Sequence, residues 1–237
     1  MKNSFILLFV CLLFSCERPS QVSITKVEGS PAFENAKLSL KDSLYQQGSD
    51  HLFSFHVEDY TLGEQTPKEF DYTLANSGQG QHIHLIINNG PYFAKYSQEF
   101  GQELEKGNNV ILAFLSRSYH ESVKNPNAYV LTQIGDGEEI DLTQELLFYS
   151  RPKGTYKGKD TEKVLLDFYL INTTISPDGN KVKATIQDTE FIIDQWEPYY
   201  IEGLPKGEIS IKLELIDSDG ELIDSPFNPS VRTVTLE

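Results

Sequence analysis

Two histidines stand two positions apart in the strand-like stretch HIHLII, and they are the residues in this chain best suited to chemistry. In an extended strand, His82 and His84 project from the same face, because side chains alternate between the two sides. His120, in the loop SRSYHES that follows another apolar stretch, is the third candidate ligand, and Glu121 can add a carboxylate or orient a ring. Three imidazoles in such a cluster would suit Zn or Cu.

A simpler interpretation, which the sequence alone favours, is that His82 and His84 are hydrogen-bonded packing residues and His120 lies in a turn. An HxH pair arises by chance, and no tight second cluster supports a metal site, although His51 and His56 are more remote candidate ligands. On this interpretation no cofactor is expected, whereas Zn or Cu is the cofactor on the metal interpretation. A pocket for an organic ligand is a third alternative.

The loop SRSYHES also allows a hydrolase, because serines surround a histidine and a glutamate. However, the chain has no GxSxG nucleophile elbow, and residues so close in a loop rarely face one another in a triad. We therefore predict that the protein is not an enzyme. The loop is better interpreted as a polar rim for an anion or a sugar, made of Arg117, Tyr119 and His120, with Glu121 as a further candidate for ligand binding.

A basic cluster, YSRPKGTYKGKD, stands out in a chain whose net charge is −15. Arg151, Lys153 and Lys157 next to glycine backbone are able to bind phosphate or carboxylate. The alternative is an interdomain loop whose cations neutralise the acidic domains. The overall negative charge argues against nucleic acid as a partner.

The first 15 residues combine one cation, an apolar run too short to span a membrane and a small residue, which is the layout of a secretory signal. The ending LFSC resembles a bacterial lipobox, so Cys16 is the predicted lipidation site. Residues 16–29 are polar and aperiodic, which predicts a flexible tether. The only other cysteine, Cys11, would be removed with the signal, leaving no thiol chemistry.

The chain aligns with itself at an offset of 100 residues, which indicates two copies of one module. Strictly alternating stretches such as ISIKLEL, with turn residues between them, predict strands in both copies. We expect an all-β protein with two tandem immunoglobulin-like β-sandwich domains, over residues 30–142 and 146–237. Matched positions include Tyr96 with Trp196, Lys106 with Lys206, Gly107 with Gly207 and Ile111 with Ile211.

At this offset His82 and His84 match Val182 and Ala184, which lie on the core face of the second copy. In the first copy the opposite face of the same stretch is also apolar. Either a register change exchanges the two faces, or both faces of the first sheet are covered. In the second case the sheet should pack on the second domain or on a partner.

With the lipobox, HIHLIINNGPY, SRSYHES, FYSRPKG and LLDFYL assembled, the chain resembles a family of uncharacterised bacterial envelope lipoproteins, some of them labelled phosphopeptide-binding protein. The resemblance implies envelope location and β modules, and it transfers no catalytic residue.

Together these observations predict a lipid-anchored protein of the bacterial envelope, periplasmic or at the cell surface. Its role would be non-catalytic binding or structure. Its partners would be the lipid anchor in a membrane and an envelope protein, a glycan or an anionic ligand. Metal binding through the histidines and a hydrolase at SRSYHES are the two alternatives.

Overall fold

The computed structural model describes residues 21–41, 45–47 and 50–237. The predicted signal segment, Cys16 and the first part of the predicted tether lie outside the described residues. Within those ranges the regular structure consists of β-strands and one short 3-10 helix, η1 (Gly158–Thr161), which confirms the all-β prediction. No helix of the described residues is long and apolar enough to cross a membrane.

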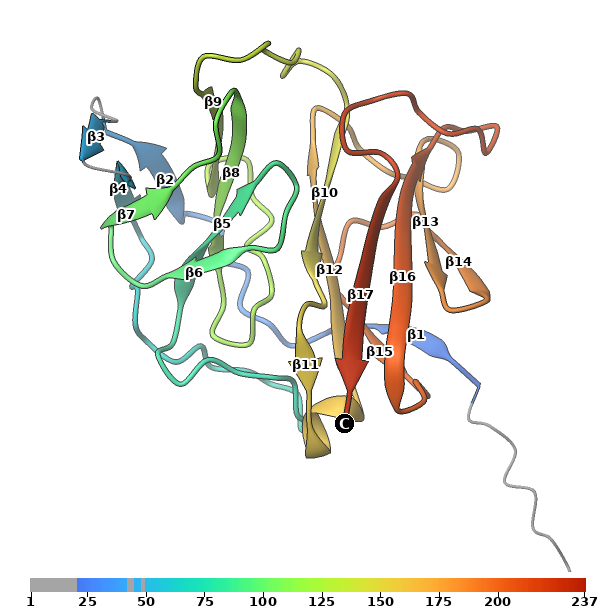
Figure 1. The fold of residues 1–237 in the computed structure, drawn as a ribbon. Helices are drawn as coiled ribbons and strands as arrows, with labels where there is room; N and C mark the ends of the chain where they lie inside the picture. The colour runs from blue at the N-terminus through green and yellow to red at the C-terminus, as the bar shows by residue number, and fades with distance from the viewer. Residues whose placement is uncertain (1–20, 42–44, 48–49) are drawn as a thin grey trace, which may run out of the picture.

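The first sandwich consists of two sheets of four strands each (Figure 1). In one sheet β4 pairs with β2, β3 and β7, and in the other β5 and β8 are central between β6 and β9. Phe53, Phe55, Ile83, Leu85 and Ala113 fill the space between the two sheets. The strands are β2 (Lys37–Leu40), β3 (Tyr45–Gln47), β4 (Asp50–Glu58), β5 (His82–Ile87), β6 (Phe93–Lys95), β7 (Glu99–Glu103), β8 (Asn109–Ser116) and β9 (Tyr129–Ile134).

The second sandwich has one sheet in the order β1-β15-β12-β10 and another in the order β11-β17-β16-β13-β14. Its core includes Phe168, Val182, Ala184, Ile211 and Leu213. The strands are β1 (Ser23–Lys26), β10 (Leu146–Arg151), β11 (Thr155–Tyr156), β12 (Val164–Ile171), β13 (Lys181–Ile186), β14 (Thr189–Ile193), β15 (Tyr199–Glu202), β16 (Gly207–Ile216) and β17 (Ser230–Leu236).

The two sandwiches have the same strand pairing. β4 pairs with β2 and β7, as β12 pairs with β10 and β15. β5 and β8 lie between β6 and β9, as β13 and β16 lie between β14 and β17. The prediction of two tandem immunoglobulin-like domains built as copies of one module is therefore confirmed by the topology.

The predicted alignment of β5 with β13 is wrong by one residue. Leu115 on β8 pairs with Ile83, whereas Leu215 on β16 pairs with Val182, so Ile83 rather than His82 is the counterpart of Val182. A slip of one residue moves every side chain to the other face of a strand. His82 and His84 consequently lie on the outer face of their sheet, where the second domain has Lys181 and Lys183.

The outer face of the first domain's β5–β8 sheet is also covered, because the second domain packs against it. We call this contact the interdomain seam, and its buried residues come from β5, β8, β10 and β12. The four sheets therefore lie side by side as successive layers (Figure 1). The seam explains why the sequence of this sheet is apolar on both faces. Its main residues are Ile86, Leu112, Phe114, Leu146, Phe148 and Tyr169.

Part of the predicted tether is a strand of the second domain. β1 pairs with the edge of β15, with Ile24 opposite Ile201, and Val22 and Ile24 pack against the core of the second sandwich. The assignment of 16–29 to a flexible tether is therefore wrong for β1, because pairing satisfies an edge strand's backbone groups and buries apolar surface. The predicted domains at 30–142 and 146–237 omit this strand.

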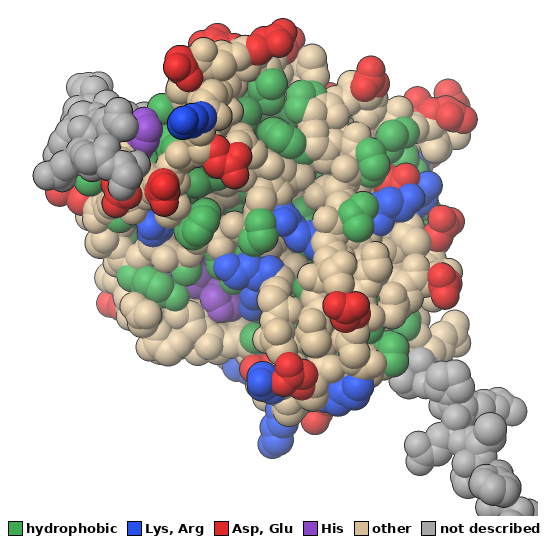
Figure 2. All heavy atoms as spheres, viewed as in Figure 1, with side chains coloured by type: hydrophobic (Ala, Val, Ile, Leu, Met, Phe, Trp, Pro, Cys, Tyr) green, Lys and Arg blue, Asp and Glu red, His purple; other side chains and the backbone are tan. Residues whose placement is uncertain are grey.

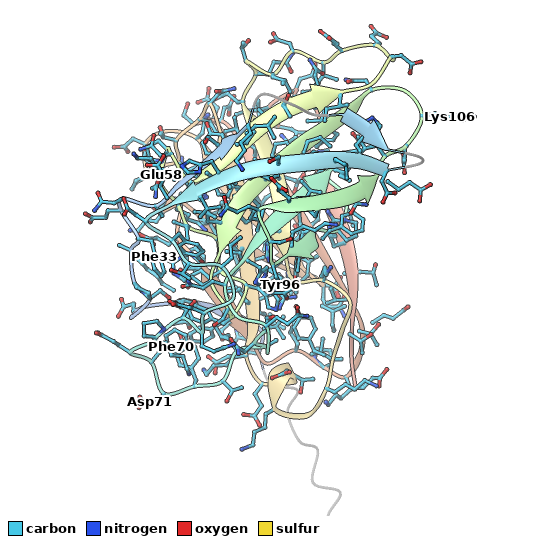
Figure 3. All side chains as sticks on the ribbon, turned by 90° about the vertical axis from the view of Figure 1, so that its left-hand side faces the viewer. Phe33, Glu58, Phe70, Asp71, Tyr96 and Lys106 are labelled. Atoms are coloured by element: carbon cyan, nitrogen blue, oxygen red, sulfur yellow. The ribbon has the colours of Figure 1, made fainter. Side chains whose placement is uncertain are left out.

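A long segment without regular strands, residues 59–81, connects β4 to β5. Phe70 and Asp71, labelled in Figure 3, mark an outward bend of this segment. Leu74 turns inward and packs in a small cluster with Val27, Tyr119 and Leu165.

Candidate metal centre

The ring nitrogens of His82, His84 and His120 converge at one end of the interdomain seam. The Nε2 atom of His82 lies 3.0 Å from Nε2 of His84 and 3.1 Å from Nδ1 of His120. One ligand atom can be chosen from each ring so that all three atoms lie within 4.8 Å of one another. Tetrahedral Zn with Zn–N bonds of about 2.0–2.1 Å holds its nitrogens about 3.4 Å apart. Two of the N···N distances are therefore within a few tenths of an ångström of the tetrahedral value.

The strand and the turn that carry these rings explain why they meet. His82 and His84 share the outer face of β5, and the antiparallel pairing sets His82 opposite Ser116 at the end of β8. The chain then turns back through a bond from the His120 amide to the Arg117 carbonyl, 2.8 Å long. His120 has φ 70°, a backbone conformation uncommon outside glycine. The turn brings its ring over the histidine pair.

A hydrogen bond determines which nitrogen of the His82 ring carries the proton. Its Nδ1 lies 2.8 Å from the carbonyl oxygen of Gly80, so Nδ1 carries the proton and Nε2 carries the lone pair. Gly80 has φ 83°, and a Cβ atom there would collide with the Gly63 carbonyl. A backbone carbonyl that holds one nitrogen of a histidine and leaves the other free is the usual support of a metal ligand.

The three rings cannot all be hydrogen-bonded to one another. The lone pair on His82 Nε2 faces two nitrogens at 3.0 and 3.1 Å, one on His84 and one on His120. One lone pair accepts one good N–H bond, so the other contact is left as lone pair against lone pair or as a crowded second donor. A cation at the centre would accept all three lone pairs.

All three histidines are held in the neutral form. Burial lowers the pKa of His82 to about 4, with the nearby cations Arg151 and Lys153 acting in the same direction. Burial, followed by the charges around them, also lowers the pKa of His84 and of His120 well below 6.5. The neutral imidazole is the form that binds metals, so these rings need no deprotonation at neutral pH.

Tyr92 and two serines complete the surroundings. The Tyr92 ring stacks on His84 with centroids 3.6 Å apart, and its hydroxyl lies 3.2 Å from Nδ1 of His120. Ser116 Oγ lies 3.1 Å from His84 Nε2, and Ser150 Oγ, from the second domain, lies 3.3 Å from His84 Nδ1. Burial raises the pKa of Tyr92 to about 12, while the charge of Arg151 opposes this effect.

The three histidines differ in burial. His82 and His84 are fully buried and His120 is only partly so. Figure 2 shows histidine atoms at the surface beside a group of Lys and Arg side chains. His120 is therefore the member of the cluster that reaches the surface.

The structure buries two residues of the predicted polar rim, Arg117 and Tyr119, and also the binding candidate Glu121, since all three are at most 4% exposed. Arg117 forms an ion pair with Glu121 (2.8 Å) and also donates to the Pro31 carbonyl. The Tyr119 hydroxyl donates to Ser30, so these side chains fasten the loop to the N-terminal segment.

The predicted basic cluster divides into two parts. Arg151 is buried beside the histidines and donates from Nη1 to the Tyr92 hydroxyl (3.0 Å), and Lys153 donates to the Tyr92 carbonyl (2.6 Å). Lys157 is exposed and pairs with Glu237 at 2.7 Å. The first two side chains belong to the surroundings of the histidines, whereas Lys157 does not.

The serines proposed for a hydrolase are held in other interactions. Ser118 accepts a bond from the Thr66 amide, and Ser122 donates to Asp167, a carboxylate also paired with Lys124. Both serines are 1% exposed. The arrangement places neither hydroxyl at an accessible surface against His120.

Sequence reasoning missed Tyr92, Ser150 and the proximity of Arg151 to the histidines. Tyr92 is only eight residues after His84, in HIHLIINNGPY, and an aromatic residue in the following turn was the one available signal. Ser150 and Arg151 approach from the other domain, so no spacing in the sequence reveals them. His51 and His56, the more remote candidate ligands, lie on β4 in the other sheet of the first sandwich and are not members of the cluster.

Comparisons with known proteins describe the fold only. No family model and no curated protein matches this chain. Fibronectin(III)-like modules of Clostridium thermocellum CbhA share 10% identity at a TM-score of 0.31, covering 84% of this chain and 94% of theirs. The central fibronectin-III array of RIM-binding protein shares 11% at 0.27, covering 85% of this chain and 68% of that one. Bacteroides ovatus SGBP-B, solved with a mixed-linkage heptasaccharide, shares 7% at 0.24, covering 85% and 70%.

Proposed function

We propose that this protein is a non-catalytic metal-binding protein that holds one Zn or Cu ion through His82, His84 and His120. The observation that carries the proposal is the convergence of the three ring nitrogens, with two N···N distances of 3.0 and 3.1 Å around a single lone pair. Neutral, buried imidazoles supported by a backbone carbonyl are typical of protein metal ligands.

Simple packing explains these contacts less well. Packing histidines are hydrogen-bonded to groups that complement them, as His82 Nδ1 is bonded to Gly80. The inner nitrogens of this cluster face one another instead. His84 Nε2 and His120 Nδ1 each have a hydroxyl within reach, that of Ser116 and that of Tyr92. One N···N contact of the cluster nevertheless sets two lone pairs against each other, and a metal ion between the rings removes that repulsion.

A metal-content measurement tests the proposal. The purified protein, loaded with Zn²⁺ or Cu²⁺ and freed of excess by gel filtration, is expected to retain about one equivalent. His120→Asn removes one ligand while keeping a residue that tolerates positive φ, so it should fold and retain far less metal. His56→Asn, at an exposed histidine of β4, is the matched control and should bind as the wild type does.

If the wild-type protein contains no metal after such loading, the proposal is wrong. Urea unfolding of each variant without metal separates loss of a ligand from loss of the fold. A stabilisation by saturating Zn²⁺ of about 2.7 kcal/mol at 100 times Kd, absent in His120→Asn, is the second expected readout.

The location we propose is the bacterial envelope, with Cys16 carrying a lipid. The signal-like first 15 residues, the LFSC ending and the resemblance to envelope lipoproteins support it. Cys16→Ala should release the protein from the membrane fraction of the expressing cell. Membrane association equal to that of the wild type would contradict the anchor.

A further inference from the structure

Three cations of the second domain, Arg151, Lys153 and Arg232, gather at one end of the interdomain seam, and each lies over a tyrosine ring. The Arg151 guanidinium lies 5.7 Å from the ring centroid of Tyr92, and Lys153 Nζ lies 3.9 Å from the same centroid. Arg232, on β17, lies 5.2 Å from the centroid of Tyr149, which belongs to β10 as Arg151 does. Figure 2 shows Lys and Arg side chains together at the surface beside histidine atoms. We call these three residues the cationic triad.

The cationic triad has no acidic partner. Among the residues that the structure describes, no carboxylate lies within ion-pair distance of Arg151, Lys153 or Arg232. Acids are not scarce, because the chain has 35 Asp and Glu against 20 Lys and Arg. Burial, followed by the charges of Arg151 and Arg232, lowers the pKa of Lys153, so these cations repel one another. Partly buried like charges are costly unless an anion joins them.

The Arg151 guanidinium has one unused edge. Its Nη1 donates to the Tyr92 hydroxyl (3.0 Å), its Nε is buried without a hydrogen-bond partner, and its Nη2 donates to no residue that the structure describes. The Nε–H bond and one Nη2–H bond of a guanidinium point in the same direction and form a fork that fits two oxygens of a carboxylate or a phosphate. Arg151 is 5% exposed, so leaving this fork without an acceptor costs free energy.

We propose that the cationic triad is a binding site for an oxyanion, the group that carboxylates and phosphates share. The Nε–Nη2 edge of Arg151 binds two oxygens, and the charges of Lys153 and Arg232 balance the charge of the anion. Arg151 is buried whereas Lys153 and Arg232 are only partly so, and the anion therefore enters past these two side chains. The site is separate from the metal centre and does not depend on it.

The cationic triad differs from the basic cluster that the sequence predicted. Lys157 is exposed and paired with Glu237, and Arg232 from the last strand takes its place beside Arg151 and Lys153. Lys157 consequently offers a control, since it is a cation of the same loop that lies outside the site.

Isothermal titration of the metal-free protein with inorganic phosphate tests the proposal. The protein is treated with EDTA, freed of EDTA by gel filtration and measured in Tris chloride at low salt, so that no other oxyanion competes. The wild type should bind phosphate saturably. Lys153→Gln and Arg232→Gln should each bind it about 10-fold or more weakly. Lys157→Gln removes the same charge from an exposed position and should stay within about 2-fold of the wild type.

Arg151→Lys tests the fork separately from the charge. Lysine keeps one positive charge but cannot bind two oxygens side by side, so phosphate affinity should fall by about 10-fold or more. Thermal unfolding shows whether each variant is folded. If Arg151→Lys is not, the Lys153 and Arg232 variants still decide the proposal, because both positions are partly exposed.

A titration with acetate distinguishes the two sources of the oxyanion. Acetate binding at least as tight as phosphate binding would assign the site to a carboxylate, and tighter phosphate binding would assign it to a phosphate. The proposal is wrong if neither anion binds saturably, or if Lys157→Gln weakens binding as much as Lys153→Gln does, because net charge alone would then explain the effect. No metal is present in these titrations, so failure of the metal centre would leave their result unchanged.

Discussion

Burial of three imidazoles makes the histidine cluster sensitive to protons. His82 and His84 are fully buried, so protonating either ring places a charge where water does not solvate it. The neighbouring Arg151 and Lys153 add repulsion to that cost. The same features that keep the rings ready for a metal therefore make the metal-free protein vulnerable to acid.

The first prediction concerns stability against pH in the metal-free protein. The folded pKa of His82 is about 4, below the value of about 6.5 expected in the unfolded chain. Between these values the unfolded chain binds a proton that the folded chain does not, so stability is present above about pH 6.5 and is lost as pH falls toward 4. The slope should reach about 1.4 kcal/mol per pH unit for each histidine.

Urea unfolding across this pH range measures the slope. His84→Phe removes one titrating ring and should flatten the curve, whereas the exposed His56→Gln should leave it unchanged. Equal slopes in the wild type and His84→Phe would show that the cluster does not titrate as its burial requires.

At the residue scale, the sequence identified the three histidines but not their environment. HxH on a strand and a histidine in a nearby loop are visible in one segment of 39 residues, from His82 to His120. Ser150 and Arg151 come from the other domain, and burial of Arg117 and Glu121 depends on the N-terminal segment that covers them. Contacts between residues of different domains produce no characteristic spacing in the sequence.

At the scale of elements, the strand register determines which face of β5 carries the histidines. The repeat in the sequence correctly indicated two copies, but an offset of 100 holds for β8 with β16 and fails by one residue for β5 with β13. Burial on one face did not reveal the slip, because β5 is buried on both faces. The second domain covers the outer face, so the usual contrast between an inner and an outer face is absent.

The strand β1 carries the second prediction. Ile24 pairs with Ile201 and packs on the second core, although the segment was expected to be a tether. Ile24→Ala should lower the free energy of unfolding by about 1–3 kcal/mol, because it removes partly buried apolar surface from an edge pairing. Thr25→Ala, at the adjacent exposed position, should change it by less than about 0.5 kcal/mol. Urea unfolding that shows equal effects for both would mean that β1 is not docked.

At the scale of the whole molecule, the proposed metal ligands belong to one domain and part of their surroundings to the other. His82, His84 and His120 lie in the first sandwich together with Tyr92, while Ser150 and Arg151 reach this cluster from β10 of the second. The interdomain seam therefore fixes the position of β10 relative to β5. Tight packing along the seam is a condition for the geometry of the centre.

The third prediction compares two buried phenylalanines of equal size. Phe148 fills the interdomain seam, and Phe55 fills the core of the first domain on the other side of the β5–β8 sheet. Replacing either by Ala should cost about 3–5 kcal/mol of stability, because each is at most 1% exposed. Phe148→Leu and Phe55→Leu are milder versions that keep both proteins folded for binding measurements.

Only the Phe148 variants should also weaken Zn²⁺ binding, since Phe148 lies two residues before Ser150 on the strand that covers the histidines. A loosened β10 moves Ser150 and Arg151 away from His84 and Tyr92, whereas a cavity at Phe55 leaves the outer face of β5 in place. Calorimetric titration measures the Zn²⁺ affinity of both Leu variants. Each titration is run the same number of degrees below the melting temperature of that variant. Equal loss of Zn²⁺ affinity in the two would mean that the seam does not hold the centre and that the first sandwich forms it unaided.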